Sequence, residues 1–187
     1  MGNKKKLLES FDIVLCEDTP NHKFLSGDKD IRSKQIDAYK KAGIDLFDVY
    51  DIPTNVFKNR LDYKIITDDW EIIFNFDNKQ YKLSVFIGGI TDGASIPIPF
   101  RFGSGTPHNQ HLDIPSLVHD CLYASKYFTF DESNIIMTAL MRWTNTPWLT
   151  RVKINTGVNL RLTEKHWNTI DTENNTLSDF MEIKEIK

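Results

Sequence analysis

The chain has 187 residues, of which 40% are hydrophobic and 26% are charged, which suits one domain with its own core. Its formal net charge of −3 argues against nucleic-acid binding, because such proteins need a basic face to neutralise phosphates. The sequence has no run of about 18 apolar residues, so a transmembrane segment is not expected.

The first part of the chain predicts short elements separated by turn-forming residues. Residues 11–15 are an apolar run that favours an edge strand, whereas residues 18–30 contain Pro, Asn, Gly and Asp and indicate a loop. Residues 33–42 predict a helix with a serine at its start and a glycine directly after its end. Residues 44–49 favour another strand.

The middle of the chain predicts an antiparallel sheet within residues 61–90. Residues 62–66, 70–76 and 80–87 are rich in aromatic and β-branched residues, and large apolar residues alternate along 70–76. Between the last two strands, the Asp-Asn-Lys sequence at 77–79 is typical of a hairpin turn. We therefore expect a half-buried antiparallel hairpin.

Three helices are expected after the sheet, at residues 113–126, 131–143 and 147–160. Their expected starting residues are Asp113, Asp131 and Thr146 followed by Pro147. Because strands come first and helices follow, we predict an α+β fold. After Trp167 the chain is polar and acidic, and the spacing of four apolar residues allows a short docking helix; these are Leu177, Phe180, Met181 and Ile183.

A glycine-rich loop at residues 88–97 is the first candidate for chemistry. Gly89 and Gly93 allow tight turns or a close approach of the backbone to a ligand. Asp92 and Ser95 supply oxygen atoms for a ligand or for hydrogen bonds. Asp92 equally suits a structural role in which it accepts hydrogen bonds from turn amides.

The expected helix around His119 is the second candidate. His119 and Tyr123 are four residues apart and share a face, whereas Asp120 points about 100° away. The helix is otherwise apolar, so these groups need partners. One hypothesis is a buried network in which Asp120 binds backbone amides and His119 binds Asp92. The other is a general base at His119, with a neighbouring carboxylate that orients the ring or holds a metal.

Residues 108–113 give a separate metal hypothesis. His108, His111 and Asp113 lie within six residues and offer ligands for Zn²⁺ or another transition metal. However, they lie in a stretch rich in Gly, Ser, Thr and Pro, and Asp113 is better explained as a helix cap. We therefore treat this site as the lesser alternative.

Two segments together resemble a bacteriophage and prophage family of unknown function. They are G-I-T-D-G-A-S-I-P at residues 89–97 and L-V-H-D-C-L-Y at residues 117–123. The family is marked by T-D-x-A-S-I-P at the end of a strand and by H-D-x-L-Y on a helix. The resemblance covers about residues 61–167 and implies a core domain there. Residues 1–60 would then be an N-terminal elaboration packed on the core, and residues 168–187 an acidic tail.

Asn134 departs from that family. Relatives carry A-D-x-x-F on a second helix, and Asn134 stands where they have the aspartate. If that aspartate is catalytic or a ligand, its function is weakened or lost here. The resemblance and this departure favour a non-enzymatic virion, tail or assembly component. Its expected partners are other phage structural proteins or further copies of itself, and its expected location is the host cytoplasm or the virion.

His119, Asp120 and Tyr123 are also similar to the H-D-x-x-Y helix of phospholipase A2. In that family the histidine activates water, the aspartate binds Ca²⁺ and the tyrosine supports the network. The glycine-rich loop would stand in for the calcium loop, so the resemblance implies that Asp92 and Asp120 are metal ligands.

A second-helix aspartate orients the histidine in phospholipase A2, and Asn134 or Asp131 would have to do so here. Asparagine cannot stabilise an imidazolium by charge, so weaker catalysis is implied. The resemblance gives the alternative function: a Ca²⁺- or Zn²⁺-dependent hydrolase acting on lipid or cell envelope. An inhibitor of a host defence system is a third option without specific support.

Overall fold

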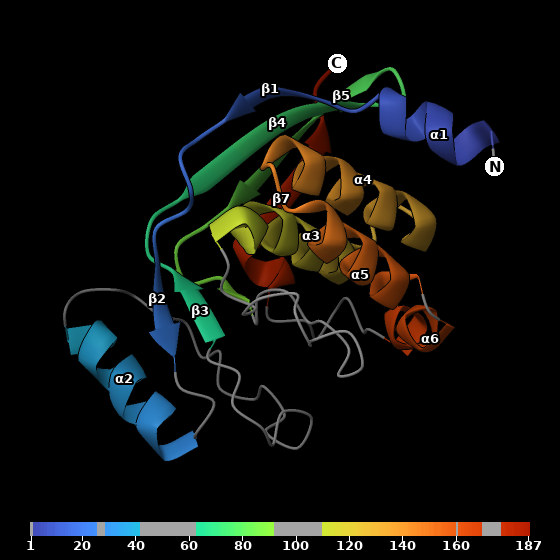
Figure 1. The fold of residues 1–187 in the computed structure, drawn as a ribbon. Helices are drawn as coiled ribbons and strands as arrows, with labels where there is room; N and C mark the ends of the chain where they lie inside the picture. The colour runs from blue at the N-terminus through green and yellow to red at the C-terminus, as the bar shows by residue number, and fades with distance from the viewer. Residues whose placement is uncertain (1, 26–28, 42–62, 92–109, 160, 170–176) are drawn as a thin grey trace.

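A computed structural model describes residues 2–25, 29–41, 63–91, 110–159, 161–169 and 177–187 (Figure 1). Its elements follow the chain as α1 (Gly2–Glu9), β1 (Asp12–Cys16), β2 (His22–Leu25), α2 (Lys29–Lys41), β3 (Tyr63–Ile66), β4 (Trp70–Phe76), β5 (Lys79–Val85), β6 (Ile90–Thr91), η2 (Gln110–Leu112), α3 (Asp113–Ser125), α4 (Phe130–Trp143), α5 (Trp148–Val158), α6 (Arg161–Thr169), η3 (Ser178–Phe180) and β7 (Met181–Glu185). Antiparallel strands precede packed helices, which confirms the predicted α+β fold class.

The larger sheet is antiparallel, with strand order β1-β4-β5-β7. The predicted hairpin is confirmed in β4 and β5, and β1 is the expected edge strand. Asp77 and Asn78 join the hairpin with φ values of 50° and 64°, a left-handed conformation that Asp and Asn tolerate. Lys79 already belongs to β5, so the turn is one residue shorter than predicted.

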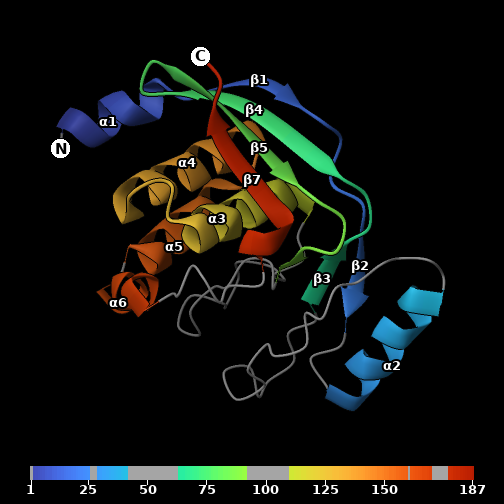
Figure 2. The same ribbon diagram turned by 180° about the vertical axis from the view of Figure 1, so that it is seen from behind.

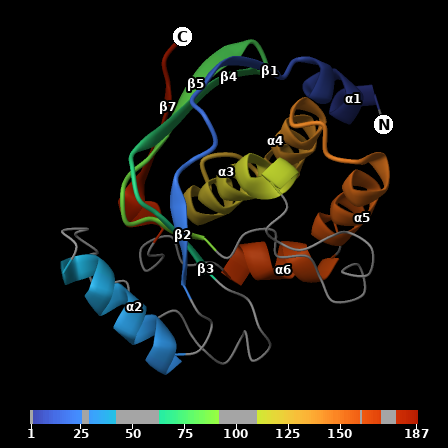
Figure 3. The same cartoon turned by 60° about the vertical axis from the view of Figure 1, so that its left-hand side comes forward.

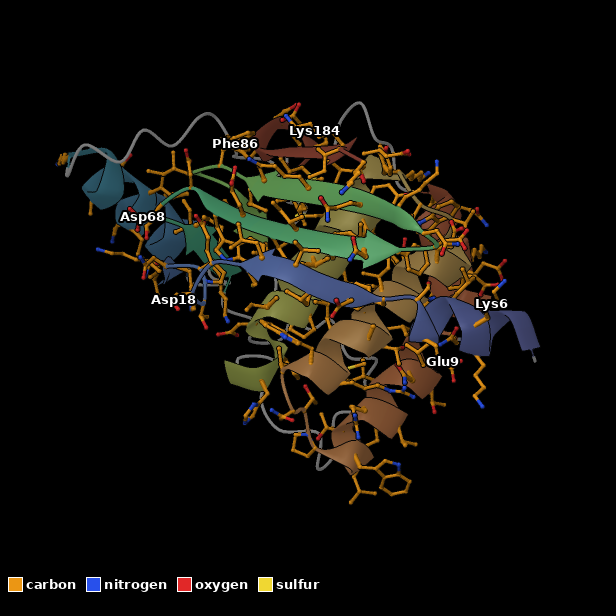
Figure 4. The ribbon with its side chains drawn as sticks, turned by 90° about the horizontal axis from the view of Figure 1, so that it is seen from above. Lys6, Glu9, Asp18, Asp68, Phe86 and Lys184 are labelled. Atoms are coloured by element: carbon orange, nitrogen blue, oxygen red, sulfur yellow. The ribbon has the colours of Figure 1, made fainter. Side chains whose placement is uncertain are left out.

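One face of this sheet is covered by helices and the other is open. Every second residue of β4 is buried, which confirms the predicted alternation. Figure 4 shows β1, β4 and β5 from the open side, with helices beneath them, and Figure 3 shows α3 and α4 inside the curve of the sheet. Phe74 lies in this core against Phe11, Tyr81 and Phe128, with ring centroids 5.5, 5.7 and 6.4 Å away.

The three helices expected after the sheet are present within two residues of their predicted ends, but their caps differ from prediction. Asp131 lies in the first turn of α4, and Thr129 is the N-cap. The Thr129 hydroxyl accepts from the Glu132 amide, and the Glu132 carboxylate accepts from the Thr129 amide at 2.8 Å. This reciprocal capping box satisfies two amides, so it is preferred over a single aspartate cap.

The N-terminal residues of the other two helices, α5 and α3, also differ from the predicted capping residues. Helix α5 begins at Trp148 with Pro147 as its N-cap, so Thr146 lies outside the helix. The N-cap of α3 is Leu112, which makes no side-chain capping hydrogen bond, and Asp113 is the first residue of the helix, with its carboxylate paired with Lys64. Tertiary contact with a buried lysine therefore replaces the local cap that the sequence predicted.

Three strands lie where the sequence predicted none, and one of them is β6, which lies within the expected glycine-rich loop at 88–97. Strand β2 occupies part of the expected loop 18–30 and pairs with β3 in a second sheet of order β2-β3-β6. Strand β7 replaces the expected docking helix and pairs with β5 (Figure 2). Met181 and Ile183 alternate with the exposed Glu182 and Lys184, a period of two that suits a strand.

Two helices were also not predicted. Helix α1 packs near α4, where Lys4 pairs with Asp131 at 2.7 Å, and α6 follows α5. Helix α2 begins four residues earlier than expected. The strand expected at 44–49 lies outside the described residues. Among the helices in the described ranges, none has the length and apolar character needed to cross a membrane.

Candidate functional site

Three buried side chains meet between α3 and α4, and we call them the polar centre: His119, Tyr123 and Asn134. Their exposed fractions are 8%, 7% and 2%. Asn134 Oδ1 lies 3.0 Å from His119 Nε2 and accepts from the Tyr123 hydroxyl at 2.9 Å. Asn134 Nδ2 donates to the backbone oxygen of Val158 at 3.3 Å. The polar centre therefore joins α3, α4 and the end of α5.

These contacts define the protonation state of the His119 ring. The Asn134 carbonyl oxygen can only accept, so His119 Nε2 carries the proton and donates it. The opposite nitrogen, Nδ1, then keeps its lone pair while the ring is neutral. The orientation of the Asn134 amide is consistent with this, because Nδ2 faces an acceptor on Val158. His119 Nδ1 is thus the basic nitrogen of the polar centre.

Burial controls the ionisation of this region. It lowers the pKa of His119 from 6.5 to about 4, and this effect exceeds the opposite effect of the hydrogen bond with Asn134, which raises the pKa. Burial also raises the pKa of Tyr123 above its ordinary value and that of Cys121 well above its own. At neutral pH, His119 is a neutral base, Tyr123 a hydrogen-bond donor and Cys121 a thiol rather than a nucleophilic thiolate.

We expect His119 to make the protein less stable in acid. The unfolded chain binds a proton at His119 below pH 6.5, whereas the folded chain does so only near pH 4. Above pH 6.5 the depressed pKa has no effect on the free energy of unfolding. As the pH falls from 6.5 to 4, the free energy of unfolding decreases by roughly 3 kcal/mol. Urea unfolding from pH 7 to 4 should show a shallower pH dependence for His119→Gln than for wild type. Parallel curves would contradict the depressed pKa.

Asp120 points to a different neighbour, as its position on the helix predicted. Its Oδ2 accepts a short hydrogen bond from the hydroxyl of Thr91, the last residue of β6. His119 and Tyr123 instead share Asn134 as partner, which confirms the prediction that the two faces of α3 contact separate neighbours. The predicted contact of His119 with Asp92 lies outside the described residues.

Gly89 is the member of the predicted loop site that the structure describes. It is buried, and its carbonyl accepts from the Ile66 amide at 2.9 Å. A Cβ at Gly89 would lie 3.4 Å from the carbonyl oxygen of Phe86, an ordinary van der Waals distance, so the packing at this position does not require glycine. The other predicted loop residues lie outside the described ranges; they are Asp92, Gly93 and Ser95.

The described residues of the lesser metal hypothesis take part in other interactions. His111 Nδ1 lies 2.9 Å from the backbone oxygen of Thr144, to which it donates. The Asp113 carboxylate pairs with Lys64, and His108 lies outside the described residues. Within the described ranges, no three His, Cys, Asp or Glu side chains are grouped so that they could hold a metal ion.

The Lys64–Asp113 ion pair is a feature that sequence reasoning missed. The two side chains are only 5% and 10% exposed. The available signal was a lysine directly before the apolar pair Ile65-Ile66 in a predicted strand, where a charged residue needs a partner if it is buried. The pair connects β3 to the first residue of α3 and so helps to position the helix that carries His119 and Asp120.

Fold and site together define an α+β protein with a buried His-Asn-Tyr centre between two helices. No family model, curated protein or solved structure matches the chain. The similarity to the phage family and to phospholipase A2 therefore rests on the short motifs alone.

Proposed function

We propose that this protein is a hydrolase of carboxylic esters, acting on lipid or cell envelope, with His119 as its general base. The observation that carries the proposal is the direction of the His119 ring. Nε2–H is held by Asn134, and Nδ1 is left as the basic nitrogen. Tyr123 donates to the same Asn134 oxygen and its ring contacts the His119 ring, so one α3 residue and one α4 residue surround the histidine. This arrangement supports the role that the phospholipase A2 resemblance implies for His119.

In this proposal His119 moves one proton in each direction. Nδ1 takes a proton from water as the water oxygen attacks the ester carbonyl carbon, and it later returns that proton to the leaving alkoxide. While the ring is positively charged, Nε2–H remains bonded to Asn134. Because an amide oxygen has no formal charge, it stabilises this imidazolium less than a carboxylate would. We therefore propose a slow hydrolase.

Ca²⁺ is the metal that we propose for this site. Asp120 and Thr91 place two oxygen atoms together at the end of β6, and Ca²⁺ binds oxygen ligands, whereas Zn²⁺ favours nitrogen and sulfur. Asp120 would hold the metal, with Asp92 as the second carboxylate that the motif suggests. Bound Ca²⁺ would polarise the ester carbonyl.

The test is ester hydrolysis by the full chain with millimolar Ca²⁺ or with EDTA. Substrates are a short-chain soluble ester and phospholipid vesicles, with released acid as the readout. We expect slow Ca²⁺-dependent turnover that falls by about 100-fold or more in His119→Gln. The matched control is His111→Gln, an exposed histidine outside the polar centre, which should keep wild-type turnover. Equal turnover in wild type and His119→Gln would refute the proposed role of His119.

A non-enzymatic virion or assembly component is the second candidate. It is favoured by the neutral Asn134 amide, which is hydrogen-bonded to three groups within the protein. Such a network suits the pinning of helices without chemistry. This candidate predicts no turnover on either substrate, together with concentration-dependent assembly of the purified chain in analytical ultracentrifugation.

A further inference from the structure

Helix α5 exposes apolar side chains on the side that faces solvent. Trp148 is 65% exposed, Leu149 61% and Val152 43%, and Trp143 at the end of α4 is 46% exposed. The opposite side of α5 is buried through Thr150, Ile154, Gly157 and Val158. Figures 1 and 3 show α5 beside α4, on the side of the helices away from the larger sheet. Its outer apolar side is therefore not part of the core.

The charge around this helix differs from that of the rest of the chain. No acidic residue occurs between Glu132 and Glu164, although the protein has 26 acidic residues and a net charge of −3. The same stretch carries four basic residues: Arg142, Arg151, Lys153 and Arg161. With 100° per residue, Arg151 and Lys153 lie on either side of the exposed apolar residues of α5. The surface is thus an apolar ridge with basic flanks.

We propose that this α5 surface, formed by Trp143, Trp148, Leu149 and Val152 with Arg142, Arg151 and Lys153, docks on an anionic lipid bilayer. Tryptophan rings favour the level of the lipid headgroups, aliphatic side chains lie deeper, and basic side chains reach the phosphates. The acidic remainder of the chain is repelled by anionic lipid, so charge also orients the protein.

The shape of the surface favours a bilayer over a macromolecular partner. Three of the four exposed apolar residues lie along one side of α5, and a helix with such a side can lie in the plane of a membrane surface. Docking needs no turnover at His119, so it goes beyond the proposed hydrolase. Val158, whose carbonyl accepts from Asn134, lies ten residues after Trp148, or roughly 15 Å along the helix. A docked α5 would thus hold the polar centre near the lipid.

The test is flotation of the full chain with vesicles in EDTA, followed by tryptophan fluorescence. We expect binding to vesicles of phosphatidylcholine mixed with phosphatidylglycerol, and much less to phosphatidylcholine alone. The double variant Trp148→Ala/Leu149→Ser should bind at least tenfold more weakly, because it removes apolar area that the bilayer would bury. Arg151→Glu should weaken anionic binding by about tenfold, with a smaller salt dependence.

Two control variants show whether vesicle binding depends on the α5 surface. Phe86→Ala, which removes another partly exposed apolar side chain next to the larger sheet (Figure 4), should bind as wild type does. His119→Gln should also bind normally, so a failure of catalysis is distinguishable from a failure of docking. The proposal is overturned if anionic vesicles do not bind, if the α5 variants bind like wild type, or if only an acidic protein or single-stranded DNA is bound.

Discussion

Asn134→Leu is expected to lower the free energy of unfolding by roughly 3 kcal/mol. Among single substitutions in the polar centre, we expect this one to have the largest effect on stability. The leucine has a similar volume but leaves three buried groups without their partner: His119 Nε2–H, the Tyr123 hydroxyl and the Val158 carbonyl. Urea unfolding at pH 7 measures the change. The matched control is Asn155→Leu on α5, because Asn155 is only half-buried and accepts one bond from Thr138.

Asn134→Asp changes charge while keeping the same shape, and it tests the electrostatics of the polar centre. A carboxylate at this position favours the charged imidazolium, so we expect the pKa of His119 to rise above its present value of about 4. NMR titration of the ring protons would measure the rise. If His119 is the base of a hydrolase, turnover should increase in the same variant. An unchanged His119 titration would mean that the two side chains are not in contact.

Lys64→Met is expected to destabilise the protein by about 3–5 kcal/mol, because it leaves the Asp113 carboxylate buried without its ion-pair partner. Much of the lost stability should return in the double variant Lys64→Met/Asp113→Leu, in which neither charge remains. A double-mutant cycle in urea isolates the coupling between the two side chains.

The exposed pair Lys79–Glu185 is the matched control for this cycle. Its side chains are 53% and 41% exposed, and its atoms lie 2.8 Å apart. Solvent screens such a pair, so Lys79→Met should destabilise the protein far less than Lys64→Met does. Similar losses at Lys64 and Lys79 would show that burial does not strengthen the Lys64–Asp113 pair.

Much of the fold follows from local pattern. The hairpin of β4 and β5 was predictable because apolar residues alternate along β4 and because Asp77-Asn78 tolerates positive φ. Helices α3 to α5 were predictable from apolar spacing. Strand β7 was not, since four apolar residues in a short tail fit a helix or a strand, and pairing with β5 decides between them.

The candidate site, like the fold, was predictable from the sequence only in part. The sequence by itself determined that His119 and Tyr123 share a face and that Asp120 points elsewhere, because helix geometry alone sets those directions. Only the tertiary structure decided that Asn134 is their common partner, that Asp113 pairs with Lys64 and that α5 turns Trp148 outward. These contacts join residues distant in sequence, and they arise from the packing of whole elements, for which no local pattern of residues is a sufficient guide.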